Sequence, residues 1–132
     1  MDFDKIIEDN FIPLTTDMTF GDMLKNCVVK SNRNIFPVID KENNFLGIVL
    51  LDTVRPNMFN EELYDIMKVE DFMQDAPEVI EYESDNMNRV MQKFQDSGAW
   101  NLPVLKAGKY AGFISKSKLL TAYRRKLIQV TS

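Results

Sequence analysis

Apolar side chains recur along the chain in a pattern that occurs twice. From Phe20 to Val28 they stand at positions i, i+3, i+4, i+7 and i+8, which is the stripe of an amphipathic helix, and from Met87 to Phe94 they repeat the first four of these positions. Each stripe is followed by two short runs that are apolar almost throughout, which indicates strands covered on both faces. We therefore expect a helix over each stripe. We expect strands at Ile35–Asp40, Phe45–Leu51, Leu102–Leu105 and Tyr110–Ser115.

Polar residues around these runs predict where the helices begin. Thr15–Thr19 supplies hydroxyl and carboxylate caps for the first stripe, and Ser84 and Asp85 supply them for the second. Asp52 is placed to cap a short helix at Thr53–Met58, directly after the second strand. Further helical segments are predicted at Asp2–Asn10, Glu61–Met67, Val69–Met73 and Lys116–Ile128.

Prolines and glycines fall at matching places in the two halves. Pro37 and Pro103, each followed by valine, lie 66 residues apart, and Gly47 and Gly112, each within a second strand, lie 65 apart. A brief extended piece also precedes each stripe, at Phe11–Leu14 and at Glu78–Ile80. The same order of elements is therefore present twice, as a β-α-β-β-α unit. The sequence predicts a mixed α/β (α+β) fold with two repeats, residues 1–67 and residues 68–132.

Composition excludes several classes of protein. The 132 residues carry a net charge of −4 and have a pI of about 4.8, which argues against non-specific binding of nucleic acid. The chain has no histidine and one cysteine, so a transition-metal site, histidine-based acid–base chemistry and an internal disulfide are not expected. That cysteine, Cys27, stands on the apolar face of the first stripe, where we expect a buried structural thiol.

Sequence patterns of enzymes and of membrane segments are missing. The chain lacks a Gly-rich phosphate loop followed by Lys-Ser/Thr, and it lacks any pairing of a nucleophile with a base. It also has no apolar run of the length that crosses a bilayer, and no signal peptide. We expect a non-enzymatic protein of the cytoplasm, or the cytoplasmic part of a larger protein.

The duplicated unit resembles the CBS domain pair, also called the Bateman module, over nearly the whole chain. The strings that carry the resemblance are Phe36–Asp40 with Leu46–Val49, and Leu102–Leu105 with Ala111–Ser115. The resemblance implies two repeats packed with pseudo-twofold symmetry, a regulatory role and a homodimer formed through helix faces. It also implies that the cleft between the repeats can hold an adenosine compound, as it does in many members of this family.

A narrower resemblance is to the cytoplasmic CBS pair of bacterial ClC-type chloride channels or transporters. The strings that carry it are Thr16–Gly21, Arg33–Pro37, Val49–Asp52, Arg55-Pro56, Gly98–Pro103 and Phe113–Leu119. It implies an excised C-terminal regulatory region at the cytoplasmic face of the inner membrane, with the membrane part of the same parent protein as its partner. Two alternatives stay open: a stand-alone nucleotide sensor that acts on a soluble partner, and a purely structural dimerisation module with empty clefts.

The nucleotide signature of this family, Gly-h-h-Ser/Thr-x-x-Asp with h apolar, is incomplete in both copies. The resemblance implies that the hydroxyl contacts phosphate at a helix N-terminus and that the aspartate accepts hydrogen bonds from the ribose. In the first copy Leu50 replaces the hydroxyl residue, Thr53 stands at the aspartate position and Asp52 comes one residue early. In the second copy Ser115 is kept, but Lys118 replaces the aspartate. Lysine has donors only, so the second copy suits an anion better than a nucleoside.

Residues near the second copy complete the predicted site. Lys116 adds a cation, and Trp100, just before the proline strand, is placed to stack on adenine or else to pack in a core or an interface. Arg33 holds the same place in the first copy, where it either reaches a phosphate or lies solvated in a loop. The candidate ligands are ATP, ADP and AMP, and no metal site is predicted. The candidate ligand-binding residues are Ser115, Lys116, Lys118, Trp100, Asn101, Ile80, Arg33, Asp52 and Thr53.

Overall fold

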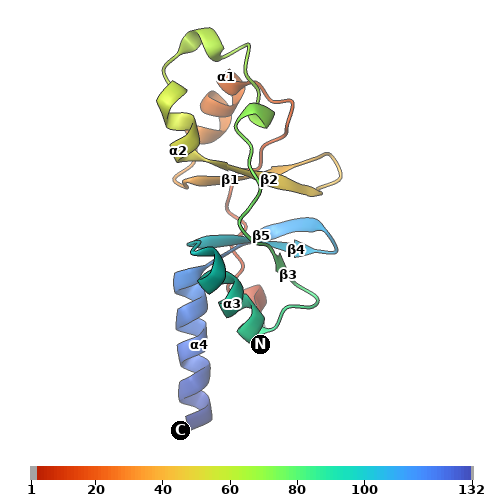
Figure 1. Ribbon diagram of the computed structural model, residues 1–132, viewed down its shortest axis with the longest axis vertical. Coiled ribbons are helices and arrows are strands. Elements are labelled where there is room, and N and C mark those ends of the chain that lie inside the picture. The colour runs from red at the N-terminus through yellow and green to blue at the C-terminus, as the bar shows by residue number, and fades with distance from the viewer. Residues whose placement is uncertain (1–2, 132) are drawn as a thin grey trace. The chain divides into compact units, whose positions relative to one another are not determined.

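The chain folds into two compact units. The computed structural model describes residues 3–131, with the side chains of residues 3–128. One unit, called the central unit below, is Asn10–Asp75, and the other, called the terminal unit, joins Met1–Asp9 to Ala76–Ser132. Figure 1 shows a small sheet with helices in each unit. The content of helices and small sheets confirms the α/β (α+β) fold that the sequence predicts.

The central unit is built on an antiparallel hairpin. β1 (Ile35–Ile39) pairs with β2 (Phe45–Leu50), and both strands agree with the predicted ones to within one residue at each end. Asp40 closes the turn between the strands, because its carboxylate accepts hydrogen bonds from the backbone N–H groups of Glu42 and Asn44.

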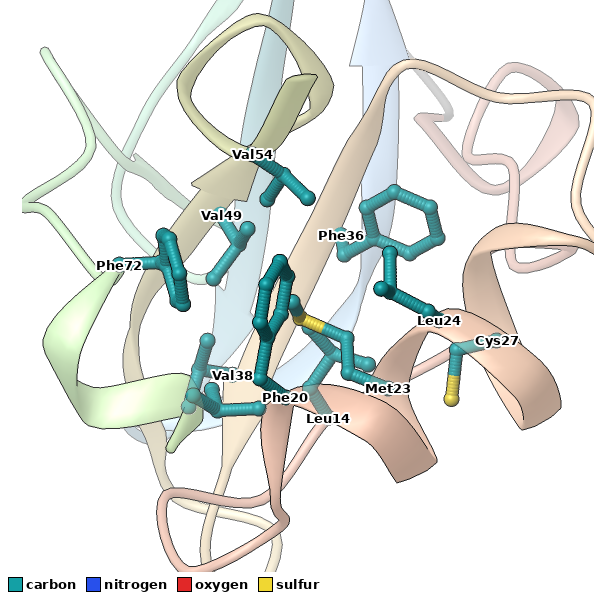
Figure 2. Close-up of a cluster of buried hydrophobic side chains, with 11 residues drawn as sticks. Leu14, Phe20, Met23, Leu24, Cys27, Phe36, Val38, Val49, Val54 and Phe72 are labelled. Carbon is teal, nitrogen blue, oxygen red and sulfur yellow. The ribbon is translucent and has the colours of Figure 1, made fainter. Parts of the chain in front are cut away.

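The first apolar stripe packs on this hairpin and forms the core of the central unit. α1 (Phe20–Met23) continues as a π-helical turn at Leu24–Val28, so the predicted helix is present. Figure 2 shows the buried cluster, in which the ring of Phe20 lies 4.7 Å from the ring of Phe72. Cys27 belongs to this cluster, and burial raises the pKa of its thiol, as expected for a structural cysteine.

The helix after β2 begins earlier than predicted. α2 (Leu51–Val54) starts directly at the end of the strand and is followed by a 3₁₀ turn at Arg55–Asn57. The N-cap is Leu50, whose side chain makes no capping hydrogen bond. Asp52 lies inside the first turn, where its carboxylate pairs with the guanidinium of Arg55. The prediction that Asp52 caps this helix is therefore wrong, because β2 runs straight into the helix without a loop.

Three predicted helical segments are single 3₁₀ turns in the structure. They are Phe3–Lys5, Glu61–Leu63 and Val69–Asp71. Asp2, where the first of them was predicted to begin, lies outside the described residues. Segments this short cannot offset the cost of nucleating a longer helix, so only the turns that are held by packing persist.

The terminal unit has a three-stranded sheet. β3 (Ile80–Glu81) is parallel to β4 (Asn101–Lys106), which is antiparallel to β5 (Lys109–Ser115). α3 (Met87–Ser97) and α4 (Lys116–Thr131) pack on the sheet (Figure 1). One apolar cluster contains residues of both helices and all three strands. None of the helices within residues 3–131 has the length and apolar character of a membrane span.

The start of α3 differs from the prediction. Asn86 is the N-cap, and its side chain accepts a hydrogen bond of 2.9 Å from the backbone N–H of Arg89. The prediction that Ser84 and Asp85 cap this helix is therefore wrong. The helix ends at Gly98, which is in the left-handed conformation with φ 67°.

A buried ion pair explains what Asp85 does instead. Its Oδ2 lies 2.7 Å from Nζ of Lys93 on α3, and the two side chains are 9% and 7% exposed. Asp85 also accepts the backbone N–H of Glu81, and Lys93 donates to the carbonyl of Val79 at 2.7 Å. The pair therefore anchors the segment before α3 to the helix itself.

Each sheet is completed by an edge segment from the other sequence repeat. Glu8 pairs with Phe113 of β5 through two backbone hydrogen bonds of 2.8 Å, and Gln74 pairs with Ile48 of β2 through bonds of 2.8 and 2.9 Å. The opening segment of the first repeat thus belongs to the terminal unit, and that of the second repeat belongs to the central unit. The compact units therefore differ from residues 1–67 and 68–132, which describe the duplication along the sequence.

Glycine is required where these edge segments cross β2 and β5. A Cβ atom on Gly112, whose φ is 136°, would lie 2.5 Å from the carbonyl oxygen of Glu8, and one on Gly47 would lie 2.7 Å from that of Gln74. Contacts this short do not occur for real Cβ atoms, so any side chain would push the edge segment away. The two glycines that mark the sequence repeat are thus sites of close backbone approach.

Candidate functional site

Four of the predicted ligand-binding residues meet at the start of α4 in the terminal unit. Ser115, the last residue of β5, is directly opposite Asn101, the first residue of β4. The backbone N–H of Lys116 donates a hydrogen bond of 2.9 Å to the carbonyl oxygen of Trp100. The register of the β4–β5 hairpin therefore brings these four residues together.

Ser115 caps α4. Its Oγ accepts a hydrogen bond of 3.2 Å from the backbone N–H of Lys118 and lies 3.4 Å from Oγ of Ser117. The first turn of a helix directs backbone N–H groups and the positive end of the helix dipole outward. This end of α4 is therefore an environment that favours a negatively charged group.

Trp100 and Lys116 present an exposed aromatic and cationic surface beside this helix start. The indole of Trp100 is 74% exposed, so it is not a core residue of its unit. Nζ of Lys116 lies 5.4 Å from the centre of the indole ring, a cation–π distance. An exposed indole beside a cation and a helix N-terminus can stack on a base and attract its phosphate.

Lys118 does not join this group. Its position is about 200° around the helix from Lys116. Its Nζ lies 3.0 Å from Oε1 of Glu8, whose side chain is only 12% exposed. Nothing in the sequence pairs Glu8 with Lys118, and Gly112 is the one sequence signal that another segment approaches β5 closely.

Ile80 also stands apart from the exposed group. It begins β3 and is fully buried in the apolar cluster of the terminal unit. Its side chain therefore contributes to packing. Among residues 3–128, no three histidine, cysteine, aspartate or glutamate side chains are arranged to hold a metal ion.

The predicted residues of the central unit are Arg33, Asp52 and Thr53, and they do not meet at one point. The guanidinium of Arg33 donates to Oδ1 of Asn10 at 2.9 Å and lies 4.5 Å from the centre of the Phe11 ring. Asp52 pairs with the guanidinium of Arg55, as described above, and Thr53 is exposed on α2. No group like that of Trp100 and Lys116 results from these contacts.

The structure also corrects the correspondence between the two copies. The backbone N–H of Leu51 donates to the carbonyl oxygen of Asn34 at 2.9 Å, as that of Lys116 donates to Trp100. Asn34, and not Arg33, is therefore the counterpart of Trp100. Asn34 and Trp100 each lie three residues before the proline of their strand, so the assignment of Arg33 was one residue too early.

One further titratable group has a shifted pKa. Burial raises the pKa of the Tyr110 phenol, with a smaller contribution from the carboxylate of Asp9. The phenol therefore stays neutral at neutral pH and adds no charge to the terminal unit.

One protein-family model matches part of the second half of the chain. Residues 69–125 match the model of the CBS domain family. A search of curated proteins finds no match. The family match includes β3 to β5, α3 and the first turns of α4, and thus the whole exposed group described above.

Solved structures extend the likeness to nearly the whole chain. OpuCA of Staphylococcus aureus has a TM-score of 0.73 at 14% identity, covering 93% of this chain and 99% of that one. CbpB, solved in complex with c-di-AMP, has a TM-score of 0.75 at 17% identity, covering 99% and 89%. CBSX2, solved in complex with AMP, has a TM-score of 0.69 at 22% identity, covering 97% and 96%. At these identities the structures show the fold alone.

Proposed function

We propose that the chain is a CBS domain pair that acts as a non-enzymatic regulatory module and binds an adenine nucleotide at the start of α4 in the terminal unit. The observation that carries the proposal is the meeting of an exposed indole, a lysine ammonium and a serine-capped helix N-terminus. The complexes of CbpB with c-di-AMP and of CBSX2 with AMP support the choice of ligand. ATP, ADP, AMP and c-di-AMP share an adenine ring and phosphate, which are the two parts that these residues suit.

The base and the phosphate of the nucleotide would contact different residues. Adenine would stack on the indole of Trp100, and a base–aromatic stack contributes about 1–3 kcal/mol. The ammonium of Lys116, which lies over the indole in the free protein, would move to the phosphate as the base takes its place. The first turn of α4, with the hydroxyl of Ser115, would hold the remaining phosphate oxygens.

The regulated partner in this proposal is the membrane part of a ClC-type chloride channel or transporter in the same parent protein. The support is the set of sequence strings given above, and the proposal places the pair at the cytoplasmic face of the membrane as a homodimer. Ligand binding regulates such a partner only if the ligand has different affinities for two conformations of the pair. A stand-alone sensor with a soluble partner and a structural module with empty clefts are the competing proposals.

Thermal unfolding and calorimetric titration with AMP, ADP, ATP and c-di-AMP test nucleotide binding. A ligand at a hundredfold excess over its Kd is expected to stabilise the protein by about 2.7 kcal/mol. Trp100→Ala is expected to weaken binding about tenfold or more and Lys116→Gln several-fold, because each removes a direct contact. Phe59→Ala is the matched control, since Phe59 is an 89% exposed aromatic residue of the central unit. Equal effects of Trp100→Ala and Phe59→Ala, or no binding at millimolar nucleotide, would reject the proposed site.

The replacement of the family's aspartate by Lys118 predicts weak recognition of the ribose. Lys118 cannot accept a hydrogen bond from a hydroxyl, and its ammonium is already paired with Glu8. AMP and 2′-deoxy-AMP are therefore expected to bind with Kd values within about threefold of each other. The two titrations under identical conditions make the comparison. A preference for AMP of tenfold or more would contradict this arrangement and would require an acceptor for the ribose elsewhere.

A further inference from the structure

A basic hollow lies in the terminal unit, between α4 and the opening segment, which is the described part of the chain up to Asp9. It measures about 340 Å³, which is within the range of small-molecule sites. Lys5 and Ile6 line it from the opening segment, and Ser117, Lys118 and Arg125 are among the α4 residues that line it. Neither Trp100 nor Lys116 lines it, so the hollow is separate from the proposed adenine subsite.

The side chains that line the hollow carry positive charges that are not all paired with carboxylates of the protein. Its ionisable lining residues are Lys5, Lys118 and Arg125, and no carboxylate lines it. Lys118 pairs with Glu8 at 3.0 Å. Within residues 3–128, no acidic side chain forms an ion pair with Lys5 or Arg125. Two exposed cations therefore face the hollow without a counterion from the described part of the chain.

We propose that this hollow binds the phosphate group of a small anionic ligand. The planar guanidinium of Arg125 can hold two phosphate oxygens at once, and the ammonium groups of Lys5 and Lys118 can hold others. Ser117 adds a hydroxyl in the first turn of α4, where the helix dipole also favours an anion. Thr121 adds no donor, because its hydroxyl already donates to the carbonyl oxygen of Ser117 at 3.0 Å.

Glu8 acts as an internal competitor for this ligand. Its carboxylate occupies Lys118 in the free protein, so a bound phosphate must share or take over that ammonium. Replacing the carboxylate by an amide leaves the backbone pairing of Glu8 with Phe113 unchanged, because that pairing uses main-chain atoms alone. Glu8→Gln is therefore expected to strengthen binding several-fold through the loss of one negative charge.

Titration calorimetry with inorganic pyrophosphate tests the hollow without involving adenine. Arg125→Gln and Lys5→Gln are each expected to weaken binding about tenfold or more, since each removes a charged hydrogen-bond donor. Arg124→Gln is the matched control, because Arg124 is an exposed arginine on the same helix that does not line the hollow. Vesicles of phosphatidylcholine with phosphatidic acid form a second arm, in which co-sedimentation lost in Arg125→Gln and kept in Arg124→Gln assigns the phosphate to a lipid headgroup.

The outcomes separate this site from the adenine subsite. Binding that is lost in Arg125→Gln and Lys5→Gln, kept in Arg124→Gln and Lys116→Gln, and strengthened in Glu8→Gln supports the proposal. Equal loss in Arg124→Gln and Arg125→Gln overturns it, because it shows general attraction to a basic helix. Absence of binding to pyrophosphate and to the vesicles that contain phosphatidic acid also overturns it, whatever the result for AMP.

Discussion

Gly112→Ala is expected to lower the free energy of unfolding by about 3–5 kcal/mol. The substitution places a Cβ atom 2.5 Å from the carbonyl oxygen of Glu8 and 2.8 Å from Cγ2 of Ile7, at a backbone φ of 136° that favours glycine. The strain and the clash act together, and the clash can be relieved only if the opening segment leaves β5. Chemical denaturation measures the loss of stability, and hydrogen exchange at Glu8 and Phe113 reports on the segment.

Gly98→Ala provides the control for the glycine prediction. Gly98 also has a positive φ, of 67°, but no atom lies within 4 Å of the position of its Cβ. This substitution carries the backbone cost alone, about 1 kcal/mol. A loss for Gly112→Ala no larger than that for Gly98→Ala would mean that the opening segment does not cross β5 as described.

Asp85→Ala is expected to lower the free energy of unfolding by about 3–5 kcal/mol. It leaves the ammonium of Lys93 buried at 7% exposure without its carboxylate, and it removes the acceptor of the backbone N–H of Glu81. Removing one member of a buried ion pair costs more than the pair contributes, because the remaining charge is left without compensation. Denaturant unfolding of the variant measures the effect.

Glu78→Ala is the matched control for the ion pair. Its carboxylate lies 3.9 Å from Nζ of Lys93, but its side chain is 38% exposed. Pairs with this exposure contribute about 0–1 kcal/mol. If Glu78→Ala and Asp85→Ala cost the same, the ion pair of Asp85 is not the one that anchors α3.

The sequence predicted the strands and the two amphipathic helices because their periodic apolar pattern is local. It did not predict the edge segments, since a single pair of backbone hydrogen bonds between Glu8 and Phe113 requires no particular side chain. Lys93 was missed for a related reason. It lies beside the apolar stripe of α3, where a lysine is typical of a solvated face, and only Asp85 makes its burial favourable.

In the candidate site, too, features of local structure could be predicted and contacts with a distant segment could not. Trp100 and Lys116 could be placed together from the sequence because they flank the two ends of one hairpin. Lys118 was assigned to the same group because it follows in the signature, yet its partner, Glu8, comes from the distant opening segment. Residues whose position depends on local structure were predicted, and those whose position depends on a distant segment were not.

In the proposed site adenine stacks on the indole of Trp100, and the fluorescence of that residue reports on the stacking. Trp100 is the only tryptophan of the chain and is 74% exposed, so its emission reports on this surface without interference from another indole. Titration with AMP is expected to quench the emission in a saturable way, with the same Kd in calorimetry, and inorganic phosphate is expected to leave it unchanged. Calorimetric binding of AMP without any change in the emission would place the nucleotide elsewhere and contradict the account.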